Sequence, residues 1–316
     1  MTHTIAPHAP RPSLSSRLIT VAALIAAAVV VALAVTSGHA PPATAHTNVQ
    51  GHAQTHAQAG FNAVYAVSGL VVGVLVGLTG VGGGSLMTPL LVLLFRFHPA
   101  TAVGTDLLYA SATKTVGTAV HGANRTVDWG ITGRLALGSL PAATATVLLL
   151  YFLHLHGDAV SKLITPALGV AILLTAIGLL FRGSIQAFAQ KRDLEFSPVA
   201  TSVLTVTLGA VLGVLITLTS VGAGAIGMTV LVLLYPKTAT SRLVGSDVAH
   251  AVPLTLIAGA GHWLLGEVNL ALLVSLLAGS IPGIVLGSQL VTRVPDKVLR
   301  PIMAVVLVLV GIKLFT

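Results

Sequence analysis

The feature that most constrains this chain is a set of five apolar segments that occurs twice. The first set covers residues of about 61–78, 81–95, 102–122, 130–153 and 162–181, and the second covers about 198–218, 221–235, 242–263, 268–290 and 298–315. The separation from Asp106 to Asp247, and likewise from His121 to His262, is 141 residues. Order, lengths and individual residues therefore indicate the duplication of one structural unit.

The composition makes lipid the expected solvent of these segments. Hydrophobic residues make up 55% and charged residues 8% of the 316 residues, and the mean hydropathy is +0.97. A soluble domain cannot bury so much apolar surface in one core. Aromatic residues amount to only 4% while glycine is abundant, which favours closely packed helices over a barrel with aromatic girdles. We therefore predict an all-α, polytopic membrane protein.

The segments and the stretches between them predict a division of the chain. Residues 18–36 form a further apolar segment before Ala43-Thr44-Ala45, and both a cleaved signal peptide and a retained helix fit it, with its length favouring the helix. The predicted parts are an N-terminal hydrophobic helix or signal peptide at 1–45, a His-rich external linker at 46–60, a transmembrane repeat at 61–182, a cytoplasmic linker at 183–197 and a second repeat at 198–316.

Five segments in each half imply that the second half enters the membrane from the opposite side, so the repeats are predicted to be inverted. With a cytoplasmic N-terminus, most basic loop residues fall inside, as the positive-inside rule requires. These residues are Arg125, Arg134, Arg182, Lys191, Arg192, Lys237, Arg242, Arg293, Lys297 and Arg300. Arg96, Lys162 and Lys313 fall outside, and the C-terminus is expected to be external.

Glycine interrupts the first two segments of each half at equivalent places. Leu78-Thr79-Gly80-Val81-Gly82-Gly83-Gly84 corresponds to Leu218-Thr219-Ser220-Val221-Gly222-Ala223-Gly224. We predict a broken helical hairpin in each half, followed by three transmembrane helices. Half-helices that begin near Gly84-Ser85 and Gly224-Ala225 would present backbone N–H groups to an anion. Close helix packing is the alternative role of these glycines. The predicted binding residues here are Gly82, Gly83, Gly84, Ser85, Thr219, Gly222 and Gly224.

Lys114 is the candidate site residue for which a purely structural role is the weakest explanation. It lies in the middle of an apolar segment, where a charge costs roughly 2.5 to 3.5 kcal/mol, and its counterpart in the other half is Thr255. At 100° per residue it shares a helix face with Asp106 and His121. We predict that Lys114 binds substrate, with an orienting salt bridge to Asp106 or Asp247 as the alternative.

A second group of polar residues is predicted to serve either proton coupling or structure. Thr105-Asp106 and Ser246-Asp247 resemble a helix cap followed by a first-turn carboxylate, although a protonatable aspartate is the other interpretation. His121 and His262 lie near the ends of their segments, where interfacial packing and proton transfer are both open.

Several classes of function are disfavoured. The chain has no cysteine and no HExxH or GxSxG motif, so we predict no catalytic residue, metal ligand or cofactor, and hence no enzyme. Basic residues are dispersed between apolar segments, which argues against a nucleic-acid partner. A metal-cation permease that uses external histidines with Asp106 and Asp247 is the alternative to an anion permease. The histidines concerned are His39, His46, His52 and His56.

The sequence Gly82-Gly83-Gly84-Ser85-Leu86-Met87-Thr88-Pro89-Leu90-Leu91, followed by Thr101-Ala102-Val103-Gly104-Thr105-Asp106-Leu107-Leu108, resembles the sulfite exporter family of TauE/SafE type. The resemblance extends from about residue 61 onward, although Ala223 replaces a central glycine in the second half. The resemblance implies a permease for sulfite or organosulfur anions such as sulfonates, driven by the proton gradient, in a bacterial plasma membrane. The expected partners are a small anion and the lipid bilayer.

Overall fold

The computed structural model describes residues 62–79, 84–154, 157–191, 197–222, 224–290 and 296–314. Every regular element within these ranges is an α-helix, which confirms the all-α prediction. The apolar segment at 18–36 and the histidine-containing stretch at 46–60 lie outside the described residues.

The helices follow the predicted apolar segments closely. They are α2 (Ala63–Thr79), α3 (Gly84–Leu93), α4 (Pro99–Ala123), α5 (Trp129–Phe152), α6 (Asp158–Lys191), α7 (Pro198–Thr219), α8 (Ile226–Leu234), α9 (Thr240–Leu264), α10 (Leu270–Leu290) and α11 (Asp296–Lys313). One difference is α6, which continues to Lys191 and so takes up the first part of the predicted linker at 183–197.

Helix length separates spanning helices from the short arms of the hairpins. At 1.5 Å per residue, the 10 residues of α3 and the 9 residues of α8 cannot cross a hydrocarbon core of about 30 Å. Five helical stretches in the described ranges are long and apolar enough to do so: Trp129–Phe152, Ala159–Phe181, Pro198–Thr219, Thr240–Leu264 and Leu270–Gly287. The chain is therefore a multi-pass membrane protein.

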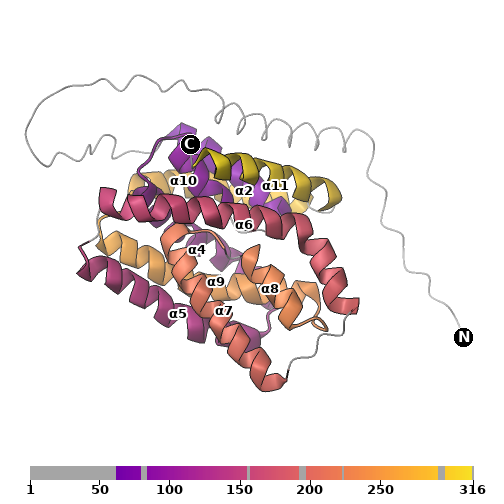
Figure 1. The fold of residues 1–316 in the computed structure, drawn as a ribbon. Helices are drawn as coiled ribbons and strands as arrows, with labels where there is room; N and C mark the ends of the chain where they lie inside the picture. The colour runs from indigo at the N-terminus through magenta and orange to yellow at the C-terminus, as the bar shows by residue number, and fades with distance from the viewer. Residues whose placement is uncertain are drawn as a thin grey trace, which may run out of the picture.

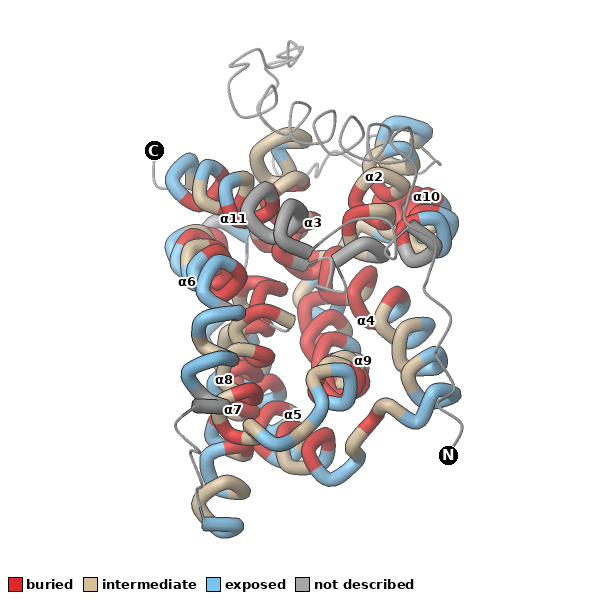
Figure 2. Tube along the Cα trace, turned by 90° about the vertical axis from the view of Figure 1, so that its right-hand side faces the viewer, coloured by how far each residue is buried: buried red, intermediate tan, exposed pale blue. Residues whose placement is uncertain are grey.

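Helices α4 and α9 occupy the centre of the molecule. In Figure 1 they lie between α10, α2 and α11 on one side and α5 and α7 on the other, and Figure 2 shows them buried along most of their length. Their polar residues explain this position, because lipid would be a poor solvent for Thr105, Asp106, Ser246 and Asp247, each of which is at most 2% exposed.

Contacts between α4 and α9 show that the two helices run antiparallel. A Cβ atom placed on Gly104 would lie 2.9 Å from the Cβ of His262, while one on Gly117 would lie 3.3 Å from Val248. Between these points the Ser111 hydroxyl donates a hydrogen bond to the Val252 carbonyl at 3.4 Å. Ser111 and Val252 are equivalent residues of the two repeats, so the two central helices cross at equivalent positions.

Each hairpin's long helix packs against a helix of the other half through glycine. A Cβ atom at Gly138 of α5 would lie 1.9 Å from the Val206 carbonyl oxygen of α7, and one at Gly279 of α10 would lie 1.7 Å from that of Ala66 of α2. The two contacts join corresponding residues of the two repeats. Such separations bring backbone against backbone, as small-residue motifs do in membrane helices. Equivalent helices that run antiparallel with reciprocal contacts are the arrangement expected of inverted repeats, although the sidedness of each half in a membrane stays a prediction.

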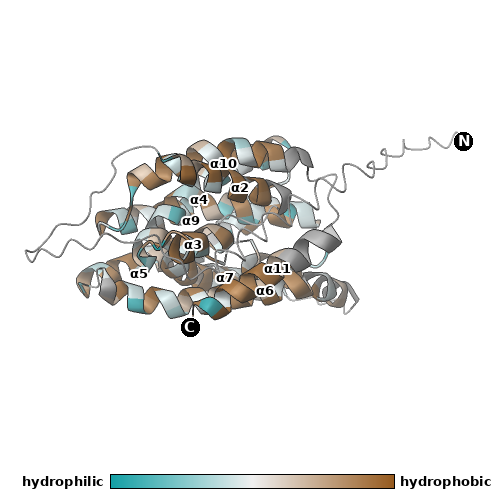
Figure 3. Cartoon of the chain, turned by 90° about the horizontal axis from the view of Figure 1, so that it is seen from above, coloured by the Kyte–Doolittle hydropathy of each residue, from teal (hydrophilic) through white to brown (hydrophobic). Residues whose placement is uncertain are grey.

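The outer surface is apolar. Side chains such as Leu137, Val199 and Val64 are exposed, and Figure 3 shows hydrophobic residues along the outer helices with paler, more polar stretches on α4 and α9 between them. Because the polar residues lie inside, the centre of the bundle is where a functional site is expected.

Candidate functional site

The break in the second hairpin is a sharp turn in the backbone. Helix α7 ends at Thr219, Ser220 adopts a left-handed conformation with φ 58°, and Gly222 and Gly224 have φ values of 130° and 100°. Positive φ angles of this size favour glycine, which explains two of the residues that the sequence singled out. Helix α8 begins at Ile226, two residues beyond the predicted start near Gly224.

Asp106 connects the two hairpins. Its carboxylate is fully buried and accepts a hydrogen bond from the Thr88 hydroxyl on α3, the short helix of the first hairpin. The Ser220 side chain, in the break of the second hairpin, lies next to the same carboxylate. Among the described residues, the second oxygen of Asp106 has no hydrogen-bond partner. A buried carboxylate therefore lies where both broken hairpins meet.

Asp247 occupies the corresponding position in the second half. It is 2% exposed, and its Oδ1 atom lies 2.9 Å from the place that a Cβ on Gly227 would take. Gly227 is in the first turn of α8, so the absence of a side chain there lets the carboxylate approach that helix. The partial positive charge of a helix start stabilises a nearby carboxylate. Each short helix thus has an aspartate of its own half beside it, next to the first turn in α8 and next to Thr88 in α3.

Lys114 is half-buried on α4 and lies within electrostatic range of both Asp247 and Asp106. Asp247 is the stronger of these two electrostatic interactions, and an orienting role of Lys114 stays the alternative to substrate binding. Asp106 precedes Lys114 by eight residues, or about 12 Å along the helix axis. The centre of the bundle therefore combines one ammonium group with two buried carboxylates.

Two further buried polar residues were missed by the sequence analysis. His250 on α9 shares a 2.7 Å hydrogen bond through its Nε2 atom with the Ser139 hydroxyl on α5, and it interacts electrostatically with Lys114. Its equivalent in the first half is Tyr109, whose hydroxyl bonds Ser280 on α10. Comparing the halves position by position would have found this pair, since Ser139 and Ser280 occur in the matched Gly-Ser-x-Pro motifs.

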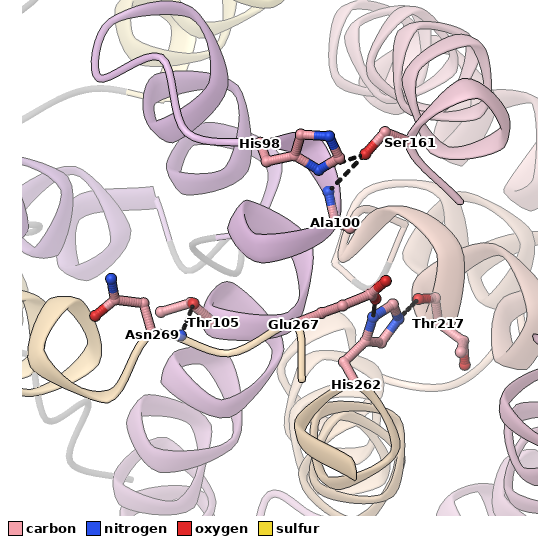
Figure 4. Close-up of polar contacts among 8 residues, drawn as sticks. All are labelled: His98, Ala100, Thr105, Ser161, Thr217, His262, Glu267 and Asn269. Carbon is pink, nitrogen blue, oxygen red and sulfur yellow. Dashed lines mark hydrogen bonds and ion pairs between the residues drawn. The ribbon is translucent and has the colours of Figure 1, made fainter. Parts of the chain in front are cut away.

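Of the two interpretations that the sequence left open for Thr105 and Ser246, the one that makes them helix caps was wrong. Helix α4 has His98 as its N-cap and α9 has Ala239, so both hydroxyl residues lie well inside their helices. Each accepts a backbone hydrogen bond from the other half instead, Thr105 from Asn269 at 3.0 Å (Figure 4) and Ser246 from Asp128 at 2.8 Å. The two hydroxyls therefore attach the starts of α10 and α5 to the central helices.

We expect Thr105→Val to lower the free energy of unfolding by about 1 to 3 kcal/mol, because the Asn269 N–H would lose its acceptor. The measurement is the thermal unfolding midpoint of purified protein in detergent. Thr144→Val is the matched control, since its hydroxyl is exposed and bonds only Leu140 of its own helix. Equal midpoints for the two variants would contradict the structural role.

The two predicted histidines differ in their surroundings. His121 is half-buried, and its Nδ1 atom bonds the Thr126 hydroxyl at 2.8 Å. His262 is fully buried, with Nδ1 at 2.7 Å from Glu267 Oε2 and Nε2 at 2.9 Å from the Thr217 carbonyl (Figure 4). Thr126 and Glu267 are equivalent positions, so the second half has a carboxylate where the first has a hydroxyl.

The remaining predicted residues have the following places. Ser85 is buried in the first turn of α3, which begins at Gly84, whereas Gly82 and Gly83 lie outside the described residues. Thr219 uses its hydroxyl within its own hairpin, as donor to the Leu215 carbonyl and acceptor from the Val221 N–H. Its hydroxyl therefore stabilises the end of α7.

The metal-cation interpretation gains no support from the geometry. No cluster of three or more His, Asp or Glu residues that could hold a metal ion occurs in the described ranges. The external histidines on which this interpretation depended lie outside those ranges.

An all-α membrane protein in which two broken hairpins meet around buried ionisable residues has the construction of a secondary transporter. Comparison with known proteins agrees with this class. The family model for the sulfite exporter TauE/SafE matches residues 65–314, and the chain belongs to this family.

Two curated relatives match this chain over most of its length and of their own. "Probable membrane transporter protein YjnA" of Bacillus subtilis is 38% identical over 247 residues, which is 78% of this chain and 96% of the relative. "Probable membrane transporter protein YdhB" of the same organism is 26% identical over 233 residues, which is 73% and 90% of the two chains. No solved structure matches this chain.

Proposed function

We propose that this membrane transporter is a proton-coupled permease for a small oxyanion, of the sulfite or sulfonate class, in the plasma membrane of a bacterium. The observation that carries the proposal is the meeting of both hairpins at Asp106, with Lys114 in range of both buried aspartates. The family, whose model carries the name sulfite exporter, supports the substrate class.

The charges at this site give a reason for proton coupling. Asp106, Asp247 and Lys114 carry a net charge of −1 when all three are ionised, and an anionic substrate would be repelled by such a site. Protonation of one aspartate removes this repulsion and leaves the ammonium group to pair with the substrate. Anion binding and proton binding would therefore favour each other.

Backbone geometry would supply the rest of the recognition. The first turns of α3 and α8 offer N–H groups and a partial positive charge, and Ser85 and Ser220 offer hydroxyl groups without adding charge. An oxyanion with three oxygen atoms suits several such donors. A site of this kind binds through many weak contacts, which permits release on the other side of the membrane.

Transport by the purified full-length chain in liposomes tests the proposal. We expect sulfite, or a sulfonate such as sulfoacetate, to enter protein-containing vesicles faster than empty ones, and an imposed pH gradient to accelerate the flux. Chloride and sulfate serve as competing anions. Failure to move sulfite or any organosulfur anion under either direction of pH gradient would refute the proposed function.

A further inference from the structure

Glu267 belongs to the loop between α9 and α10, yet its side chain is only 5% exposed. The carboxylate turns back to the His262 ring, and the backbone N–H of Glu267 donates to the His262 carbonyl at 2.9 Å. Burying a carboxylate costs free energy that a carboxylate in water does not, so a buried one usually has a specific structural or functional role.

The hydrogen bonds define which protons the pair holds. A carbonyl oxygen can only accept, so the Nε2 atom of His262 must carry a proton that it donates to Thr217. Nδ1 and Glu267 Oε2, 2.7 Å apart, then share one more proton, which resides on either atom. Removing that proton leaves a lone pair facing a carboxylate, so the hydrogen bond is replaced by repulsion. Loss of this one shared proton would therefore change the structure around the pair.

This consequence reaches the second hairpin directly. Thr217 lies in the last turn of α7, two residues before the helix ends at the glycine-containing break. On its other side the pair adjoins α4, because a Cβ on Gly104 would lie 2.4 Å from the Glu267 carbonyl oxygen. The hydrogen bonds from Glu267 to His262 and from His262 to Thr217 thus connect a loop of the second half to the helix end beside the break in its hairpin (Figure 4).

Few other ionisable groups surround the pair. Helices α7, α8 and α10 carry no titratable side chain, and among the described residues the end of α5 beside α9 adds the exposed Tyr151. On α4 the ionisable residues nearest in sequence to Gly104, which contacts the pair, are His98 and Asp106. The His98 ring bonds the Ser161 hydroxyl on α6. Asp106 is two residues from Gly104, so it points about 200° around the helix, toward Thr88.

We propose that His262 and Glu267 form a second proton-carrying group of the transport cycle, in addition to the central aspartates, with the loaded pair holding the end of α7 and the unloaded pair releasing it. This assignment rests on the proposed function, because it names the group through which proton binding acts on the second hairpin. The first half, with His121 and Thr126, lacks the carboxylate and so cannot hold a proton in the same way.

The test compares two assays on full-length variants in liposomes. Sulfite uptake driven by a pH gradient requires proton release and uptake, whereas exchange of sulfite for labelled sulfite at equal pH requires only substrate movement. In Glu267→Gln the side-chain amide can donate a hydrogen bond to Nδ1 of His262, so the contact between the two side chains is kept. The amide can neither gain nor lose a proton, so the pair can no longer carry one. We expect this variant to lose at least about nine-tenths of the gradient-driven uptake while exchange continues. His262→Gln should separate the two assays in the same direction.

Thr126→Val is the matched control, since it alters the equivalent position of the first half, and we expect both assays to stay at the level of the unmodified protein. Gradient-driven uptake that persists in Glu267→Gln would overturn the assignment while leaving the proposed function intact. Loss of both assays in both variants, with an unchanged thermal unfolding midpoint, would overturn it too, because that result assigns the pair to substrate binding. Failure of the unmodified protein to move sulfite refutes the proposed function itself.

Discussion

Lys114→Thr is expected to lower the initial rate of anion transport by about tenfold or more. The ammonium group is the one positive side chain in range of both Asp106 and Asp247 that the described residues place at the central site. Each 1.36 kcal/mol of substrate binding that is lost in the transition state slows transport tenfold, so the loss of one charge-assisted contact is enough for this effect. The measurement is the initial rate of sulfite uptake into liposomes at equal protein content.

Two further variants sharpen this prediction. Lys162→Thr removes an exposed lysine of α6 and is expected to leave the rate unchanged. Lys114→Thr combined with Thr255→Lys moves the charge to the equivalent position of α9, close to the crossing at Ser111 and Val252. We expect the double variant to recover part of the lost rate. A single Lys114→Thr variant that transports at the original rate would contradict a role in substrate binding.

Gly138→Ala is expected to destabilise the protein by about 1 to 3 kcal/mol or to prevent its folding. A Cβ atom there would lie 1.9 Å from the Val206 carbonyl oxygen and 2.7 Å from the Ala210 nitrogen, and backbone atoms of α7 cannot move aside without separating the helices. The thermal unfolding midpoint and the yield of monodisperse protein in detergent measure the effect.

Helix α5 supplies its own control for this variant. Nothing lies within 4 Å of a Cβ placed on Gly133, so Gly133→Ala is expected to be neutral or slightly stabilising. Because the repeat makes the Gly279 contact with Ala66 equivalent, Gly279→Ala should resemble Gly138→Ala. A normal unfolding midpoint for Gly138→Ala would show that α5 and α7 do not pack as closely as the structure has them.

The helical segments could be predicted from the sequence because lipid imposes a simple rule. Every backbone polar group in hydrocarbon must be satisfied within its own segment, so apolar length and glycine interruptions largely define the helices. The broken hairpins were predicted on this basis, and α3 and α8 begin within two residues of the expected positions. The starts of α4 and α9 were placed too late, since their first turns, from Pro99 and Thr240, are too polar to count as apolar segment.

The interactions of the polar residues were harder to predict, because they depend on contacts between distant parts of the chain. Thr105 and Ser246 have the sequence context of caps, and only the crossing of the two halves reveals that they bind backbone N–H groups of Asn269 and Asp128. Glu267 lies in a loop whose sequence carries no periodic signal. Its contrast with Thr126 in the other half was the available indication.

The reciprocal contacts at the α4–α9 crossing also bear on how the second conformation of a transport cycle can be obtained. The two halves make equivalent contacts across a common centre, so their conformations can be exchanged. Each half then adopts the conformation that the other half had before. The described backbone of the second half is then a template for the described part of the first half in the opposite state, and the reverse. Residues whose types differ between the halves, Lys114 and Glu267 among them, are the ones that give the two states unequal energies, while the gradients of substrate and proton set the direction of net transport.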